Sequence, residues 1–388
     1  MPRPRRVAIM LDLDWPYKRH AGVFAGSQQY AQEQGWESII DEYVDDTLTI
    51  RLGQPVPYDG VIARATKKLA HRAAQVNVPV VNVWHSSPAY TKLPGVYADL
   101  ESAGRMRAEH LLARGFRRFA AWICSDDRGQ SAELKAFAAT VEEVGFSCAS
   151  VETPLESYST LKNWRKTERA MAAWMKDWEL PIGVYAGNEK NGRMVIQMCR
   201  NRGWRVPEDV AVIAGWNEET LCEYLRPTMS SVEVGYERIG YEAARMLDRM
   251  MDGKAPPKEP LLTPIQGLVV RESTDFFAVD DELIAAALGF IAANSHLQIG
   301  PEDVARAVTT ETRTLQRRFR KYLDRPIATE IRRVRIERAK RELEQSKRPL
   351  ARIARDVGFG EAMRMYEVFR RELGITPSAY RRERQSAG

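Results

Sequence analysis

The last hundred residues contain an internal repeat, which limits the possible folds more than any other feature of the chain. The segment VARAV at 304–308 recurs as IARDV at 353–357, and TLQRRFRKYLDRP at 314–326 recurs as RMYEVFRRELGITP at 364–377. A repeat of this size indicates two copies of one supersecondary unit. Each copy is expected to be a short helix, a tight turn and a second, amphipathic helix.

The second helix of the first copy has an apolar face and a cationic face. Leu315 and Phe319 recur at helical spacing and are expected to face the core, and Thr309 and Thr310 to cap the helix. The opposite face carries Arg313, Gln316, Arg317 and Arg320. Arginine can pair with guanine and glutamine with adenine, so this face predicts base contacts from the first three residues and a phosphate contact from Arg320. The alternative is a merely solvated helical surface.

The equivalent helix of the second copy is less basic. Its exposed face is expected to carry Met363, Arg364 and Glu367 as DNA contacts. Glu367 could accept a hydrogen bond from a cytosine amine, or it could be a surface acid, and the sequence leaves both open.

The positive charge is concentrated in this repeated segment. Residues 281–388 hold 23 lysines plus arginines and 15 aspartates plus glutamates, a net charge of +8, whereas the whole chain carries +6. A basic tail on a nearly neutral body predicts a polyanionic partner for the tail alone. Double-stranded promoter DNA is the partner that fits the repeat.

The segment 281–383 resembles the AraC/XylS family of DNA-binding domains. The residues that carry the resemblance are RTLQRRFRKYLDRPIATEIRRVRIERAKREL and IARDVGFGEAMRMYEVFRRELGITPSAYRR. The resemblance implies two helix-turn-helix units joined by a long helix at about 328–345. That helix would place the two recognition helices in adjacent major-groove segments on one face of the duplex.

The residues before the repeat alternate between short apolar runs and amphipathic stretches, which is typical of a parallel α/β sheet covered on both faces. The expected strands are 6–11, 59–64, 78–84, 118–124, 182–187 and 209–216, and the expected helices 23–34, 101–114, 131–144, 165–178 and 192–201. The proline-rich stretch 252–264 is expected to be a loop, followed by a short strand at 265–270. We expect a sensing domain at 1–275, a linker at 276–284 and an all-α DNA-binding domain at 285–384.

The first 275 residues resemble the two-lobed periplasmic-binding-protein fold that LacI/GalR-type regulators use as a sensor. The resemblance lies in VYAGNEKNGRMVIQMCRNRGWRVPEDVAVIAGWNEE and LRPTMSSVEVGYERIGYEAARML. In open α/β sheets a ligand binds beyond the carboxyl ends of the strands. The ligand-binding candidates there are Asp12, Asp14, Trp15, Arg64, Trp84, His85, Asp99, Ser125, Asp126, Asn188, Glu189, Trp216 and Asn217.

The resemblance implies a monosaccharide effector such as xylose, whose binding closes the lobes and alters operator binding. Sugar-binding relatives usually carry an aspartate where this chain has Trp216. Another pentose, a modified sugar or a less polar ligand is therefore also open. The same resemblance implies a homodimer and, for an activator, RNA polymerase as a partner.

An enzyme and a transport-type binding protein are the rival interpretations. No GxSxG, GxxxxGK[ST] or HExxH motif occurs, and the four cysteines and five histidines form no metal-binding spacing, so we expect no catalysis, cofactor or metal. The basic, then apolar, start is more typical of a buried strand than of a signal peptide. No apolar run is long enough to span a membrane, and we expect a cytoplasmic protein.

Overall fold

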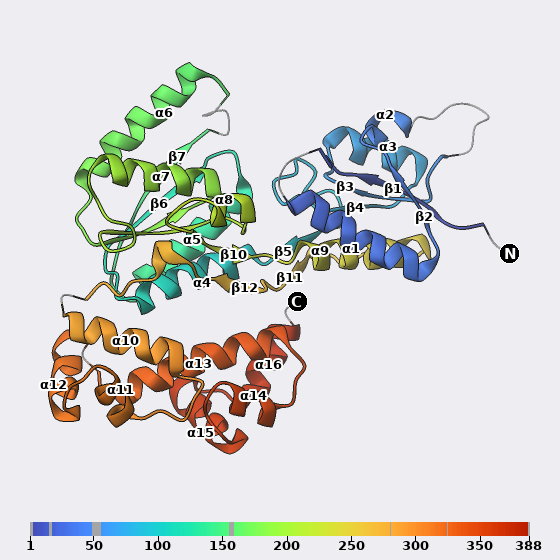
Figure 1. Ribbon diagram of the computed structural model, residues 1–388. Coiled ribbons are helices and arrows are strands. Elements are labelled where there is room, and N and C mark those ends of the chain that lie inside the picture. Colours follow the sequence, from blue (N-terminus) through green and yellow to red (C-terminus); the bar gives the residue numbers. More distant parts are fainter. Residues whose placement is uncertain are drawn as a thin grey trace.

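The computed structural model describes residues 3–14, 18–48, 56–154, 159–279, 281–323 and 325–386. Two α/β lobes are followed by a helical part, which confirms the fold class expected from the sequence (Figure 1). In the described residues no helix is both long and apolar enough to cross a membrane.

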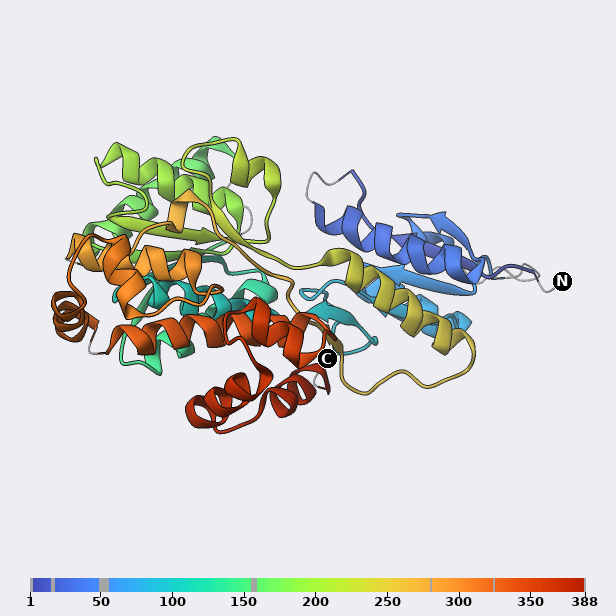
Figure 2. The same ribbon diagram turned by 60° about the horizontal axis from the view of Figure 1, so that its bottom comes forward.

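The first lobe is built on a four-stranded parallel sheet in the order β2-β1-β3-β4. Its strands are β1 (Arg6–Met10), β2 (Glu37–Ile40), β3 (Gly60–Ala63) and β4 (Val80–Asn82), and its helices α1 (Lys18–Gln34), α2 (Val44–Thr47), α3 (Lys67–Val76) and α9 (Tyr236–Met251). Helix α9 comes from much later in the chain and lies along α1 (Figure 2). The chain therefore returns to the first lobe after building the second.

The second lobe is built on a six-stranded sheet in the order β12-β10-β9-β8-β6-β7. Its strands are β6 (Phe119–Cys124), β7 (Cys148–Thr153), β8 (Ile182–Ala186), β9 (Val210–Ala214), β10 (Ser230–Glu233) and β12 (Gly267–Val269). Its helices are α4 (Leu100–Ala113), α5 (Arg128–Glu142), α6 (Leu161–Trp174), α7 (Glu189–Asn201) and α8 (Glu219–Glu223), with short 3-10 turns η2 (Met175–Asp177) and η3 (Glu272–Thr274). Every residue of β6, β8 and β9 is buried, as their continuous apolar runs predicted.

Two details of the segment that follows α9 differ from expectation. The stretch 252–264 is not a loop throughout, because β11 (Leu261–Thr263) pairs in parallel with β5 (Val96–Ala98). This pairing satisfies backbone groups beside the buried β5 strand. The strand expected at 265–270 does form, as β12, but it is antiparallel to β10 in an otherwise parallel sheet.

The helical part has two hydrophobic clusters that share one long helix. The helices are α10 (Glu282–Asn294), α11 (Pro301–Ala307), α12 (Thr312–Leu323), α13 (Ile327–Gln345), α14 (Leu350–Asp356), α15 (Ala362–Leu373) and α16 (Pro377–Ser386). The first cluster surrounds Phe319 and the second Phe369, and α13 supplies Ile331 to one and Ile336 to the other. The long helix expected at 328–345 is thus confirmed. The expected caps are wrong: α12 begins at Thr312, and Thr309 lies in the preceding turn with a φ of 53°.

The segment between the lobes and the helical part packs on both. Phe276 and Ala278 pack against the core of the second lobe, whereas Phe277 and Val279 pack against the first helical cluster. The amide of Ala278 donates to the carbonyl oxygen of Arg114 at 2.7 Å. Alternate side chains of an extended segment point to opposite sides, so this connection is held between two cores.

Candidate functional site

A pocket lies between the two α/β lobes, beyond the carboxyl ends of β1, β3, β4 and β6. Its walls are Leu11, Arg19, His20, Val23, Arg64, Val83, Trp84, His85, Ser86, Tyr97, Ala98, Leu100, Asp127, Gly129, Trp216, Val234, Tyr236 and Ile239. Both lobes and the crossing from β10 to α9 contribute to this wall. A ligand held there would contact all three elements at once.

Two guanidinium groups of the pocket lie over tryptophan rings. The guanidinium carbon of Arg64 is 4.3 Å from the centroid of the Trp84 ring, and that of Arg19 is 5.5 Å from the Trp216 ring. Burial lowers the pKa of Arg64, and the Arg19 charge lowers it further. A stacked guanidinium still presents its N–H edges in the plane of the group, so both arginines can donate hydrogen bonds to a ligand.

Asp127 connects the two lobes at the pocket wall. Its Oδ1 accepts from Ser86 Oγ of the first lobe at 2.9 Å and from the Gly129 amide of the second lobe at 2.9 Å. Gln130 donates to the same carboxylate through its backbone and its side chain, both at 3.3 Å. Asp127 thereby caps α5 and is largely occupied by protein donors.

Trp216 is fixed by buried acids behind the pocket. Its indole Nε1 donates to Glu133 Oε1 at 2.9 Å, and Glu133 forms an ion pair with Arg107 at 3.2 Å in which neither side chain is exposed. The backbone amide of Trp216 donates to Glu189 at 2.5 Å. Burial raises the pKa of Glu189. The ring of Trp216 therefore forms a preorganised wall.

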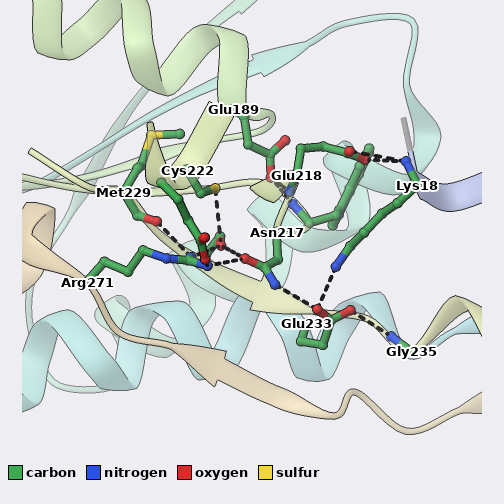
Figure 3. A network of polar contacts seen from close by, with 12 residues as sticks. Lys18, Glu189, Asn217, Glu218, Cys222, Met229, Glu233, Gly235 and Arg271 are labelled. Atoms are coloured by element: carbon green, nitrogen blue, oxygen red, sulfur yellow. Dashed lines mark hydrogen bonds and ion pairs between the residues drawn. The ribbon is translucent and has the colours of Figure 1, made fainter. Parts of the chain in front are cut away.

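Asn217 does not line the pocket and belongs to a polar network that spans both lobes (Figure 3). Its Nδ2 donates to Glu233 at 2.7 Å, and its Oδ1 accepts from Arg271 at 2.8 Å. The Lys18 side chain forms an ion pair with the same Glu233 at 2.6 Å, and the Lys18 amide donates to both oxygens of Glu218 at 3.1 Å. The network thus joins the start of α1 to the chain that leads toward the helical part.

The two helices that follow the turns of the repeat present polar side chains to solvent. On α12, Arg313, Arg317 and Arg320 are exposed and Gln316 is half-buried, and on α15, Met363, Arg364 and Glu367 are exposed. In the described residues, no hydrogen bond or ion pair joins Arg313, Gln316 or Arg317 to another side chain. Leu315 and Phe319 are fully buried, as expected. The arginines of the α12 face can therefore meet an external partner without first breaking an ion pair with another described side chain.

Both parts of the chain match domain families. Residues 108–274 match a periplasmic binding protein-like domain, and residues 304–383 match a helix-turn-helix domain. The chain is 27% identical to the xylose operon regulatory protein of Escherichia coli strain K12, over 97% of this chain and 96% of that protein. The chain is a DNA-binding transcription regulator.

Further comparisons extend over the whole regulator. The xylose operon regulatory protein of Haemophilus influenzae is 24% identical over 97% of the regulator and 98% of that protein. The solved structure of a xylose-binding transcription activator, xylR, matches with a TM-score of 0.58 and 25% identity, covering 98% of each chain. The similarity to these proteins therefore extends over both the α/β lobes and the helical part.

The ligand-binding residues expected from the sequence divide into those in the pocket and those outside it. Arg64, Trp84, His85 and Trp216 line the pocket. Asp12, Asp14, Asp99, Ser125, Asp126, Asn188, Glu189 and Asn217 are not in its wall, and Trp15 lies outside the described residues. Asp99 and Asn188 cap α4 and α7, and Glu189 and Asn217 belong to the networks behind the pocket.

Sequence reasoning missed several residues of the pocket wall. Arg19 and His20 lie on the first turn of α1, not at a strand end, and Tyr236 lies at the start of α9. A search limited to strand ends cannot find them. Asp127 directly follows the expected Asp126. The two can be distinguished because Asp127, and not Asp126, is the N-cap residue of α5.

Proposed function

We propose that the regulator binds promoter DNA through α12 and α15 and that a small effector bound between the lobes alters this binding. The observation that carries the proposal is the presence in one chain of a pocket shared by two lobes and of two exposed recognition helices. A ligand shifts a conformational equilibrium only if it binds one state better. An effector that contacts both lobes binds the closed state better than the open state, because closure brings both lobes against it.

We assign the DNA contacts unequally to the two recognition helices. Arg313, Gln316 and Arg317 read base edges, and Arg320 contacts phosphate. On α15, Met363, Arg364 and Glu367 face the second groove segment. The amino-terminal half of a recognition helix enters the groove, and these residues lie in the first turns of α12 and α15.

We propose a sugar-sized effector, with xylose as the reference compound because the relatives are named as xylose operon regulators and a xylose-binding activator. The aromatic rings and the guanidiniums of the pocket suit a ligand with an apolar face and polar edges. We assign effector sensing to 1–275, the connection to 276–284 and DNA binding to 285–384. We further propose that the regulator acts in the cytoplasm as a homodimer without catalytic activity, and that RNA polymerase is its partner if it activates.

Selection of operator DNA from random sequence by the full chain, followed by affinity measurement, tests this proposal. Arg317→Ala is expected to cost about 1–3 kcal/mol at one operator position and to relax the base preference there. Arg249→Ala is the matched control, because Arg249 is exposed on α9, far from the recognition helices. Binding is expected to weaken steeply with salt. Equal affinity of the Arg317 and Arg249 variants would show that α12 does not read bases.

A further inference from the structure

Of the described residues that line the interlobe pocket, half belong to one hydrophobic cluster that is centred on the first lobe. They are Leu11, Val23, Val83, Ala98, Leu100, Trp216, Val234, Tyr236 and Ile239. Most of them are buried within the cluster, whereas Val83, Leu100 and Trp216 are half-buried. These three residues therefore have the most surface left with which to meet a ligand.

The three half-buried residues, which we call the apolar wall, come from both lobes. Val83 follows β4 of the first lobe, Leu100 is the first residue of α4, and Trp216 follows β9 of the second lobe. The side chains of Val83 and Leu100 are hydrocarbons. The one polar group of the Trp216 side chain, its indole N–H, already donates to Glu133 Oε1 at 2.9 Å. The apolar wall therefore offers a ligand carbon atoms alone.

A hydroxyl group and a methyl group differ in how well they suit the apolar wall. A hydroxyl directed at it loses its hydrogen bonds to water and gains none from these side chains. A methyl group at the same place leaves water without that loss, and its burial is favourable. A hydrophobic site distinguishes two ligands that differ by one such group roughly ten- to a hundred-fold in affinity.

The apolar wall meets hydrogen-bonding groups at Gly129. A Cβ atom on Gly129 would lie 3.0 Å from Leu100 Cδ1 and 3.1 Å from Asp127 Oδ1, and 3.9 Å from His85 Nδ1. Asp127 Oδ2 accepts from Gln130 at 3.3 Å and has a second lone pair for a ligand hydroxyl. Burial lowers the pKa of His85, so its neutral imidazole can both donate and accept. Ligand hydroxyls therefore find partners directly beside the apolar wall.

We infer that the effector of this regulator is a sugar that carries a methyl group, as a deoxy sugar or as a methyl ether, and that the apolar wall binds this group between the lobes. Asp127 and His85 bind hydroxyls of the same sugar. This inference rests on the proposed function and narrows its ligand class. D-Xylose, the reference compound, has no methyl group and is expected to bind more weakly than a matching methyl-bearing sugar.

Isothermal titration calorimetry on the full chain compares three pairs of sugars. In two pairs, L-mannose with L-rhamnose and D-galactose with D-fucose, a methyl group replaces a hydroxymethyl group. In the third pair, D-xylose with methyl β-D-xylopyranoside, a methoxy group replaces a hydroxyl. We expect at least one methyl-bearing sugar to bind about ten-fold or more tightly than its partner. The first two pairs and the third decide between a deoxy sugar and a methyl ether.

Leu100→Asn and Val83→Thr place a polar group in the apolar wall at similar side-chain size, and we expect them to reduce the preference for the methyl-bearing sugar about five-fold or more. Leu161→Asn is the control for Leu100, because Leu161 is likewise the first residue of a helix, α6, but is 64% exposed. Val144→Thr is the control for Val83, since Val144 is 55% exposed. Both controls should leave the preference unchanged.

The sugar pairs are measured on the unaltered chain, so the first test does not depend on the folding of any variant. Polar sugars that bind within ten-fold of their methyl-bearing partners would overturn this inference and leave the sugar effector in place. A methyl preference that neither Leu100→Asn nor Val83→Thr reduces would overturn the assignment to the apolar wall. Absence of binding by every probe, with operator binding intact, would overturn the sugar assignment as well.

Discussion

Arg335 Nε, on the long helix α13, donates a hydrogen bond to the carbonyl oxygen of Ser295 at 2.8 Å. The Nη2 atom of the same side chain donates to Leu297 at 2.7 Å and to Ile299 at 3.3 Å. Arg335 is 5% exposed, so one buried guanidinium holds the loop between α10 and α11. That loop also contacts the turn of the second helix-turn-helix unit, since Gln298 donates to the carbonyl oxygen of Gly358 at 3.2 Å.

Arg335→Lys is expected to destabilise the helical part by about 1–3 kcal/mol, because an ammonium cannot reproduce the planar set of bonds to three carbonyls. Urea unfolding of the full chain, followed by circular dichroism, measures the loss. Arg370→Lys, at an exposed position of α15, is the control and should change stability by less than about 0.5 kcal/mol. Similar values for the two variants would mean that the Arg335 bonds contribute nothing.

Two glycines of the second helix-turn-helix unit have a positive φ but different surroundings. Gly358 has a φ of 94°, and a Cβ there would lie 2.2 Å from the carbonyl oxygen of Ser295. Gly374, after α15, has a φ of 73° with open space around its Cβ position. Gly374→Ala should therefore cost about 1 kcal/mol through backbone strain alone, and Gly358→Ala clearly more, because the clash adds to the strain.

Urea unfolding of the two glycine variants separates the free-energy cost of the steric clash from the cost of backbone strain. We also expect Gly358→Ala to weaken operator binding more than Gly374→Ala, since the clash displaces the turn that sets α14 against α15. Equal losses of stability for both variants would show that the loop at Ser295 moves away from the added Cβ atom without any further loss of unfolding free energy.

Glu218 predicts a pH dependence of stability. Burial raises its pKa from the usual 4.5 to about 7 in the folded chain. The folded state therefore binds more protons than the unfolded state between these values, and the stabilisation is complete below pH 4.5 and is lost as the pH rises through 7. Between pH 5 and pH 8 the unfolding free energy of the unaltered chain should therefore fall by about 1–3 kcal/mol more than that of the Glu218→Gln variant.

Urea unfolding at pH 5, 6, 7 and 8 measures this slope. Glu219→Gln is the matched control, because its side chain is the exposed neighbour of Glu218. If both variants keep the slope of the unaltered chain, Glu218 does not titrate in this range.

The sequence predicted the architecture well because its patterns are local. The apolar runs of β6, β8 and β9 and the spacing of Leu315 and Phe319 each report directly on burial. Strand-end reasoning likewise led to Arg64, Trp84 and His85, since parallel strands end at one edge of a sheet.

The remaining features depend on contacts between distant segments, which local patterns do not report. Arg19 reaches the pocket because α1 begins beside it, and Asn217, which does not line the pocket, is hydrogen-bonded to Glu233 and Arg271. Thr309 was expected to cap a helix, yet it lies in a left-handed turn at a place where the second copy of the repeat has Gly358. A β-branched residue rarely adopts a left-handed conformation. The conformation of Thr309 could have been predicted only from its position in the repeat, which corresponds to that of Gly358.

The last prediction concerns the connection between the lobes and the helical part. The ring of Phe277 packs on the first helical cluster and lies 5.0 Å from the guanidinium carbon of Arg114, while Phe276 and Ala278 pack on the second lobe. Phe277→Ala removes the ring that contacts the helical cluster and Arg114, and leaves Phe276 and Ala278 packed on the second lobe. We expect the variant to bind operator DNA and effector separately, but with the effect of the effector on DNA affinity reduced several-fold.

Calorimetric unfolding should then show two separate transitions where the unaltered chain shows more closely coupled ones. Val270→Ala is the control, because Val270 precedes the same connection but is 43% exposed. A Phe277 variant that retains full effector control of DNA binding would show that the Phe277 ring does not carry the signal between the domains.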